Sequence, residues 1–374
     1  MKDMGLRKRA VALLDCSLVR FVLFVAVPFL FLVFCGLHPK SYVTGLVSTV
    51  GIYIVLASSL NLINGFSGMF SMGHAAFMAI GAYISAFLTL SESVKANECP
   101  ALPDWLIHTQ APFAVALVAA GAAAALVAVL VSFTIIHTKG HYLSVVTLAL
   151  IVVIRALIDN NDSITRGSRG LNGIQPLSTI PAVYLVVVVT LFVLYRTIRS
   201  AYGRGLISMR DDPVAAQTLG VNLTAKKISS FAISAFFAGL GGALWAHYLT
   251  AISGANFYFE KSFDIVEISI IGGMFSLSGA VLGAIFCTVL PEFFAPLENG
   301  LHIAGFRLPT FFGLSNIIMA ALLVLLIIFH RQGIMGYSEI IVESWFSKET
   351  YTALFKKSEY GKVRSALAAL FRGT

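Results

Sequence analysis

The chain has 374 residues, of which 58% are hydrophobic and only 12% are charged, and its formal net charge is +8. A soluble protein of this length has too little interior to bury so many apolar side chains, and soluble domains are about one quarter charged, so the composition excludes a soluble enzyme or binding domain. The basic residues lie at the two ends and in one loop, and no segment resembles a nucleic-acid-binding module, so no nucleic acid partner is indicated.

Windows of about twenty apolar residues, the length that crosses a bilayer as a helix, predict an all-α polytopic membrane protein with about ten spans, some short or broken. The first window, residues 20–37, lacks the A-x-A pattern of a cleaved signal peptide and is therefore predicted to stay as a membrane helix. Residues 262–295 are too long for one crossing, and GGMFSLSG at 272–279 predicts a break between two short helices, 262–275 and 277–295. The other spans are expected at 41–63, 68–90, 112–136, 142–158, 181–195, 228–250 and 310–329.

The placement of Lys and Arg predicts the orientation, because positive residues are retained in the cytoplasm. With the N-terminus inside, most of them lie in a basic N-terminus (1–19), a loop at 196–227 and a basic tail at 336–374. An odd number of spans would put that tail outside, so we expect both termini in the cytoplasm and one transmembrane domain over residues 20–335. The basic residues expected on the outer side are Lys40, Lys95, Arg166, Arg169, Lys261 and Arg307.

The loop at 196–227 separates two long apolar runs and predicts a folded cytoplasmic segment. Within it, Ala215, Ala216 and Gly220 have the spacing A-A-x-x-x-G, the small-residue pattern of the loop by which ABC importer permeases contact their ATPases. We therefore favour docking of a partner. The alternative is that the loop only anchors the topology through Arg204, Arg210, Lys226 and Lys227.

A short coupling helix is expected over residues 212–219 of this loop, because Asp211 or Asp212 can serve as its N-cap and Pro213 fits its first position. Gly220 would end the helix, since glycine adopts a positive φ without strain. The two alanines would let the helix lie close in a groove of the partner, where larger side chains could not enter.

The segment NLINGFSGMFSMGHAAFMAIGAYI at residues 61–84 combines a glycine-rich break with polar side chains at membrane depth. A helix broken there must satisfy its freed N–H and C=O groups against protein or a water-filled cavity, and transporters often place their pathway at such breaks. The alternative is a packing seam, because Gly73, Phe77 and Gly81 recur every four residues. The residues predicted here for the pathway are Asn61, Asn64, Ser67, Ser71 and His74.

The four letters GMFS of residues 68–71 recur at 273–276, again at a glycine break that leads into a small-residue helix, which hints at an internal duplication. Both copies are expected on the cytoplasmic side. Glu267 lies just before the second break. An acid inside a membrane helix is either a pathway group or the partner of a polar neighbour, and we include Glu267 among the predicted pathway residues.

The outer loop at residues 159–180 contains Gly167, Gly170 and Gly173 at three-residue spacing, which cannot form a stable helix. Together with Arg166 and Arg169 they could contact a partner or shape the mouth of the pathway. A plain solvated turn is the alternative.

The sequence contains no G-x-x-x-x-G-K-[ST] phosphate loop, G-x-S-x-G elbow or H-E-x-x-H motif, so it predicts no site for ATP hydrolysis or for membrane-embedded catalysis. The cysteines at positions 16, 35, 99 and 287 have no C-x-x-C spacing, so neither a metal site nor a redox pair is expected. No cofactor is therefore expected on this chain.

Three segments, residues 61–83, 165–174 and 203–244, together resemble permeases of branched-chain amino-acid ABC importers, the LivM type of the LivH/LivM family. The resemblance implies a transmembrane subunit that pairs with a LivH-like second permease, with two cytoplasmic ABC ATPases that bind ATP and Mg, and with a periplasmic substrate-binding protein. The outer loop would face that binding protein. The residues that this likeness places on the ATPase-docking helix are Arg210, Asp211, Ala215, Ala216 and Gly220.

The sequence departs from the family pattern at two positions. Val214 stands where the general importer motif has Glu, and Arg166 stands where the outer loop more often has Gly. The basic tail also sets Val363, Leu367, Leu370 and Phe371 on one helical face, which predicts a surface helix attracted to anionic lipid.

From these observations we expect an inner-membrane permease subunit of an ATP-driven, high-affinity importer for leucine, isoleucine and valine. An importer of urea or short amides is an alternative, because substrate selection would rest mainly with the binding protein. An ion-coupled secondary transporter is a second alternative, for which only Glu267 and Arg155 offer intramembrane charges.

Overall fold

The computed structural model describes residues 41–135, 142–298, 302–303, 306–307, 313–330, 332–336 and 339, nearly all of them within one compact unit over residues 35–338. The predicted span at 20–37, the basic N-terminus (1–19) and the amphipathic helix of the tail lie outside the described residues. The elements are α3 (Ser41–Asn61), the π-helix η1 (Leu62–Phe66), α4 (His74–Thr89), α5 (Glu92–Glu98), α6 (Asp104–Ile107), α7 (Phe113–Ile135), α8 (Tyr142–Asp159), α9 (Asp162–Thr165), η2 (Gly167–Arg169), α10 (Ile180–Arg199), α11 (Ala201–Asp211), α12 (Pro213–Thr218), α13 (Leu223–Leu249), η3 (Gly254–Phe257), α14 (Phe259–Gly272), α15 (Leu277–Glu298), β1 (His302–Ile303), β2 (Phe306–Arg307) and α16 (Leu314–Phe329).

Six of these helices are long and apolar enough to cross a membrane. The pair α4 and α5, bent by 120°, would make a seventh, and α16 is a shorter apolar helix. In the described part of the chain, β1 and β2 are the only strands, and they form a two-residue antiparallel pair. The prediction of an all-α polytopic membrane protein is therefore confirmed. The six long helices are Tyr42–Phe66, Phe113–Thr134, Tyr142–Asp159, Ile180–Arg199, Leu223–Leu249 and Leu277–Phe294.

Each predicted span within the described residues overlaps a helix, although α4 begins at His74 and the predicted span at residue 68, and the expected break at 272–279 is present. There α14 ends at Gly272, Gly273 has φ +114°, and α15 begins at Leu277. α14 has only 14 residues and rises about 21 Å, less than the hydrocarbon core of about 30 Å. The count of ten crossings and the orientation therefore stay predictions.

The predicted start of this helix at residue 262 is wrong. α14 begins at Phe259, so Lys261 lies in its first turn instead of in an outer loop. The physical reason is a tertiary contact, because the Lys261 ammonium donates to the hydroxyl of Tyr53 on α3 at 2.8 Å. A partner on a distant helix of this kind leaves no local signal in the sequence.

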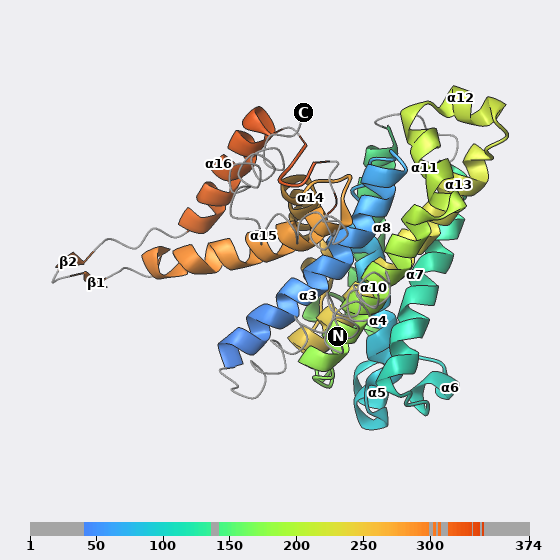
Figure 1. Cartoon of the computed structure of the whole chain (residues 1–374). Helices are drawn as coiled ribbons and strands as arrows, with labels where there is room; N and C mark the ends of the chain where they lie inside the picture. The colour runs from blue at the N-terminus through green and yellow to red at the C-terminus, as the bar shows by residue number, and fades with distance from the viewer. Residues whose placement is uncertain are drawn as a thin grey trace, which may run out of the picture. The chain divides into compact units, whose positions relative to one another are not determined.

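The centre of the bundle is α13, which packs along α7, α4 and α3 (Figure 1). A methyl group on Gly81 of α4 would overlap the backbone of Gly239 in α13, so the absence of side chains allows the two helices to approach. Beside this contact the rings of Phe77 and Phe231 meet edge to face, with centroids 5.4 Å apart. The packing seam offered as the alternative for the glycines is thus confirmed at Gly81.

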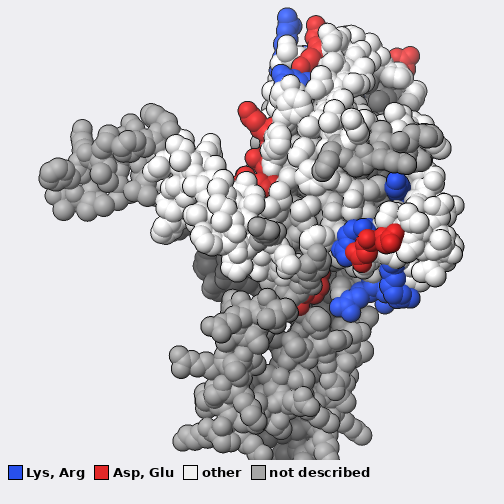
Figure 2. All heavy atoms as spheres, turned by 90° about the horizontal axis from the view of Figure 1, so that it is seen from above, with Lys and Arg blue, Asp and Glu red and all other residues white. Residues whose placement is uncertain are grey.

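Figure 2 looks onto the end of the bundle that carries α12, the top of Figure 1. The charged side chains in that view lie in a few small groups on a surface made mostly of other residues (Figure 2).

The two predicted glycine breaks lie against each other, and Asn61 joins them. Its side-chain amide donates to the carbonyl oxygens of Gly273 at 3.2 Å and Ser276 at 2.9 Å, and its oxygen accepts from the Ser269 hydroxyl. Next to it, a methyl group on Gly65 would overlap the carbonyl oxygen of Met274. We call this contact between η1 and the α14–α15 break the break junction.

Replacement of Asn61 by Leu should destabilise the protein, because the buried Ser269 hydroxyl would lose the oxygen to which it donates. The Gly273 and Ser276 carbonyls would each keep only a backbone hydrogen bond of 3.3 Å. Each buried polar group left unpaired costs about 1–3 kcal/mol, so the melting temperature of the purified protein in detergent should fall measurably. The control is Asn160→Ala, which removes an exposed amide whose 2.8 Å bond is to Ala156. Equal melting temperatures for Asn61→Leu and the control would contradict this role.

Candidate functional site

The loop between α10 and α13 folds into two helices, and its caps are local. Ser200 accepts a hydrogen bond from the backbone of Gly203 and begins α11. Asp212 Oδ1 accepts from the backbone N–H groups of Val214 at 2.9 Å and Ala215 at 3.0 Å, with Pro213 at the first position of α12. The predicted short helix is therefore confirmed, and Asp212 is its N-cap.

The end of α12 also follows the prediction. Gly220 has φ +85°, and the backbone N–H of Val221 donates to the carbonyl of Ala216 at 3.0 Å. Asn222 then caps α13 by accepting from the Ala225 N–H at 3.0 Å. This second cap is not part of our sequence analysis, although an Asn before an apolar run is a recognised start signal for a helix.

The side chains that α12 presents differ from the expectation. Ala216 is only 2% exposed and turns toward its own chain, so the prediction that it faces a partner's groove is wrong. The short α12 has to pack between α11 and α13, and its inward position leaves room only for a small side chain. The exposed apolar groups are instead Val214 at 71% and Leu219 at 82%, while Ala215 is exposed beside them.

Arg210 connects this loop to the break junction. It lies near the end of α11 and its Nη1 donates to the carbonyl of Gly65 at 3.3 Å, while its guanidinium carbon lies 5.1 Å from the ring centre of Phe275. Gly68, with φ +70°, leaves the space for it, because a methyl group there would lie 2.6 Å from Arg210 Cγ. Asp211 pairs with the guanidinium at 2.8 Å. Arg210, three residues before the start of α12, thus contacts both GMFS breaks.

The polar residues predicted for a pathway between residues 61 and 74 are all buried in this chain. Asn64 closes the loop after η1, since its oxygen accepts from the Ser71 N–H at 2.9 Å and its amide donates to the Ser71 carbonyl at 3.1 Å. Ser67 donates to the carbonyl of Ile63 at 2.7 Å, and His74 Nε2 lies 2.9 Å from the hydroxyl of Ser59. Their place in a pathway stays a prediction.

Two residues of α8 complete this loop and are absent from our sequence analysis. The hydroxyl of Thr147 accepts from the Met72 N–H at 3.0 Å, and the hydroxyl of Ser144 donates to the Phe70 carbonyl at 2.9 Å. The freed backbone groups of the first break are thus satisfied by protein, one of the two solutions available at membrane depth. Hydroxyl residues on an apolar helix are too common in sequence to identify this role.

The outer loop is ordered by its glycines. Gly167, Gly170 and Gly173 have φ of +53°, +76° and +78°, which explains why no α-helix forms over them and only the short 3-10 helix η2 begins at Gly167. Leu171 and Ile252 form an antiparallel bridge, with N···O distances of 2.7 and 2.9 Å, that fixes the loop to the chain after α13. The loop therefore has a defined surface that a partner could bind.

The two arginines of this loop lie in different settings. Arg166 has φ +60°, a conformation that costs a residue with a side chain about 1–2 kcal/mol, and its guanidinium pairs with Glu98 on α5 at 3.0 Å. Arg169 is exposed. The unusual backbone at Arg166 explains why glycine would suit this position, and the ion pair offsets part of the strain.

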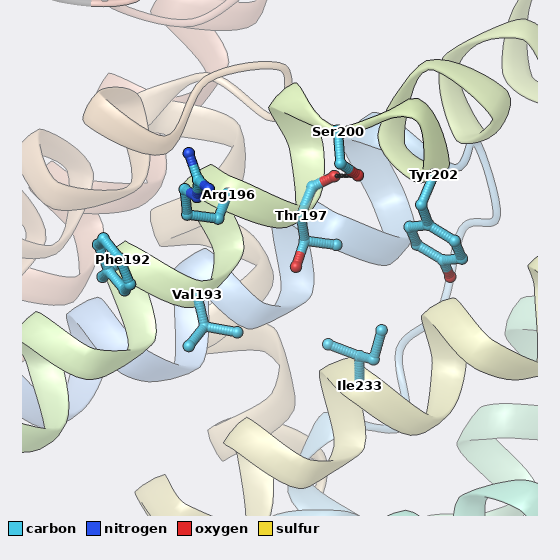
Figure 3. A pocket seen from close by; sticks show the side chains of 7 residues that line it. All are labelled: Phe192, Val193, Arg196, Thr197, Ser200, Tyr202 and Ile233. Carbon is cyan, nitrogen blue, oxygen red and sulfur yellow. Dashed lines mark hydrogen bonds between the residues drawn. The ribbon is translucent and has the colours of Figure 1, made fainter. Parts of the chain in front are cut away.

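A surface pocket of about 450 Å³ lies where α10 turns into α11 (Figure 3). Its lining is mostly apolar, and Ser200 in its rim donates to the carbonyl of Thr197 at 2.6 Å. It contains none of the residues predicted for the pathway. The residues that line it are Phe192, Val193, Arg196, Thr197, Ser200, Tyr202 and Ile233.

The fold and this loop define an integral membrane protein whose broken helices are tied to a capped helical loop. A model of the family described as branched-chain amino acid transport system / permease component matches residues 42–329, and the chain belongs to this family.

Among curated proteins, the chain is similar to the high-affinity branched-chain amino acid transport system permease protein LivM of Salmonella typhimurium and to that of Escherichia coli. Each is 29% identical over 318 residues, which cover 76% of this chain and 68% of the relative. A shorter match, 27% identical over 154 residues, covers 40% of this chain and 43% of the guanosine ABC transporter permease protein NupQ of Bacillus subtilis. No solved structure matches this chain.

Replacement of Arg210 by Met should lower uptake of the transported substrate at least about tenfold, while the protein still inserts into the membrane. The reason is that one charge-assisted hydrogen bond is worth about 1.5–3 kcal/mol, and about 1.4 kcal/mol corresponds to a factor of ten. Uptake into cells or liposomes measures it. The matched control on the same helix is Arg204→Met, whose exposed guanidinium donates only to the Arg199 carbonyl at 3.3 Å in the described structure. Normal uptake by the Arg210→Met variant would show that transport does not depend on Arg210.

Proposed function

We propose that this chain is a LivM-like permease subunit of an ATP-driven, high-affinity importer that carries leucine, isoleucine and valine across the inner membrane. Family membership and the similarity to LivM support the substrate class. The observation that carries the mechanism is Arg210, which contacts both helix breaks immediately before the capped helix α12.

In this proposal α12 docks on one of two cytoplasmic ABC ATPases, which hold the ATP and Mg. Val214 and Leu219 supply an exposed apolar contact, and the rigid capping by Asp212 and Gly220 lets a displacement of α12 reach Arg210. Arg210 passes that displacement to the break junction, where two membrane helices end. ATP hydrolysis on the partner is thereby linked to movement of the membrane segments.

The remaining partners are a LivH-like second permease and a periplasmic binding protein, which would meet the outer loop around Arg169 and Gly173. Both termini would lie in the cytoplasm. Urea or short amides as cargo and an ion-coupled transporter have less support, because two curated matches over 318 residues are named as permease proteins of a high-affinity branched-chain amino acid transport system.

The docking step is tested by Ala215→Glu and Leu219→Glu, at exposed positions in and directly after α12, in the complex purified with its ATPases. A carboxylate in an apolar contact loses its hydration without gaining a partner, so each variant should lower the co-purified ATPase at least about tenfold. The measurement is the ratio of ATPase to permease in the purified complex.

The matched control for docking is Trp105→Glu, because Trp105 is a large apolar residue, 69% exposed, on α6 in the expected outer loop. It should keep the normal ratio of ATPase to permease. A normal ratio in both α12 variants would show that the loop only anchors the topology, and the importer mechanism would lose its structural basis.

The orientation is tested with a reporter fused after Thr374 that is active only in the cytoplasm. An even number of spans with the N-terminus inside predicts an active fusion. Activity only with a periplasmic reporter would show an odd number of crossings, with α14 and α15 together making a single crossing.

A further inference from the structure

Three charged residues follow one face of α14. Lys261, Asp264 and Glu267 are spaced three residues apart, so they lie in a row along this helix. We call this row the charged face of α14. Its members differ in environment: the side chain of Lys261 is 17% exposed, that of Asp264 is 47% exposed, and Glu267 is half-buried.

The charged face lies at membrane depth. Lys261 reaches Tyr53, which stands near the middle of the long apolar helix Tyr42–Phe66, and the lysine ammonium lies 4.5 Å from the ring centre of Trp245 on α13. A charged side chain at this depth is costly if it meets lipid, and such residues face protein or water. The surface around Asp264 therefore borders either a water-filled route or another protein.

The lysine and the aromatic rings form a connected group. Lys261 pairs with Asp264 at 3.3 Å, and the Tyr53 hydroxyl lies 3.4 Å from the same carboxylate. The ammonium also lies 5.1 Å from the Tyr53 ring centre. In these contacts the charge of Lys261 is paired with that of Asp264, and about half of the Asp264 side chain remains at the surface.

Three polar atoms on α13, α14 and α15 have no hydrogen-bond partner within the described residues. They are Oε1 of Glu267 on α14, Nε1 of Trp245 on α13 and Oγ1 of Thr288 on α15, all of them buried. Buried polar groups are nearly always paired, so unpaired ones from three helices call for an occupant. Cys287, next to Thr288, lies within electrostatic reach of Glu267 and Asp264, which brings α15 to the same place.

The chemistry of these groups fits an amino acid head group. The Lys261 ammonium and the Trp245 N–H are donors that suit a carboxylate, and the carboxylates of Asp264 and Glu267 are acceptors that suit an ammonium. Phe263, 50% exposed on α14, offers an apolar neighbour for the side chain of such a molecule. A purely structural ion pair between α14 and α3 would explain Lys261 and Tyr53, but not the unpaired Glu267 and Trp245 atoms.

We propose that the charged face of α14, with Tyr53 and Trp245, lines this chain's part of the translocation route and transiently binds the α-ammonium and α-carboxylate of the amino acid. This inference rests on the proposed function, and it adds the residues and the ligand chemistry of the route. The Lys261 group would receive the carboxylate, and Asp264 and Glu267 would successively receive the ammonium as the substrate moves along α14.

The first test uses the importer purified with all its subunits, reconstituted in liposomes and supplied with binding protein, ATP and radiolabelled leucine. The variants are Asp264→Asn and Glu267→Gln, which keep side-chain size and remove the charge. Each should lower leucine uptake at least about tenfold. The matched control is Asp104→Asn on α6, an exposed aspartate in the expected outer loop, which should transport normally.

The second test separates a binding role from a structural one. In a chain whose four native cysteines are replaced by serine, the variant Phe263→Cys, at a 50% exposed position next to Asp264, should react with a positively charged methanethiosulfonate reagent. Leucine-loaded binding protein with ATP should slow the reaction several-fold. A cysteine in place of Val118, 60% exposed on the apolar helix α7, should not react.

The outcomes separate the inference from the proposed function. If the wild-type chain co-purifies its ATPases and imports leucine, but a cysteine at position 263 is inert or unprotected, or both charge variants transport normally, the charged face is structural and this inference fails alone. If the wild-type chain neither binds ATPases nor imports leucine with them, the proposed function itself fails.

Discussion

A helix that breaks inside a membrane must find partners for its freed backbone groups within the protein, and the structure depends on how this constraint is met. Asn61, next to the first break, holds the second break, whereas the first break is held by Asn64 within it and by residues of α8 and α11. Asn61 binds two carbonyls of the second break, and Arg210 donates to the carbonyl of Gly65 in the first. Because each such group would cost about 1–3 kcal/mol if unpaired, the two breaks and α11 should move as a connected unit.

The contact of Arg210 with the first break connects the loop at 196–227 to the membrane helices. α12 has a side-chain cap at one end and a positive-φ glycine at the other, and both are built from residues within the loop. Its buried Ala216 fixes it to the chain, while Val214 and Leu219 remain outside. In the proposed mechanism, a displacement of this exposed face would be carried by the capped helix to Arg210, whereas a flexible loop would absorb it.

The two further polar regions are the outer loop and the charged face of α14. The outer loop holds its shape through three positive-φ glycines, a two-bond bridge to Ile252 and the ion pair of Arg166 with Glu98. The charged face of α14 lies between that region and the break junction, since α14 runs from the outer loop side at Phe259 to Gly272 at the junction. One short helix thus joins the groups suited to a charged substrate with the groups that contact Arg210.

The sequence by itself determined the features that arise from neighbouring residues. Local apolar length explains the predicted spans within the described residues, and capping explains the helix begun by Asp212 and ended by Gly220. Backbone freedom explains the break at Gly273 and the glycine loop without an α-helix. Only the tertiary structure decided which residues each face of a helix contacts. Ala216 turns inward, Lys261 enters α14, and Asn61 binds residues more than two hundred positions away, because these contacts depend on helices that are distant in the chain and adjacent only after packing.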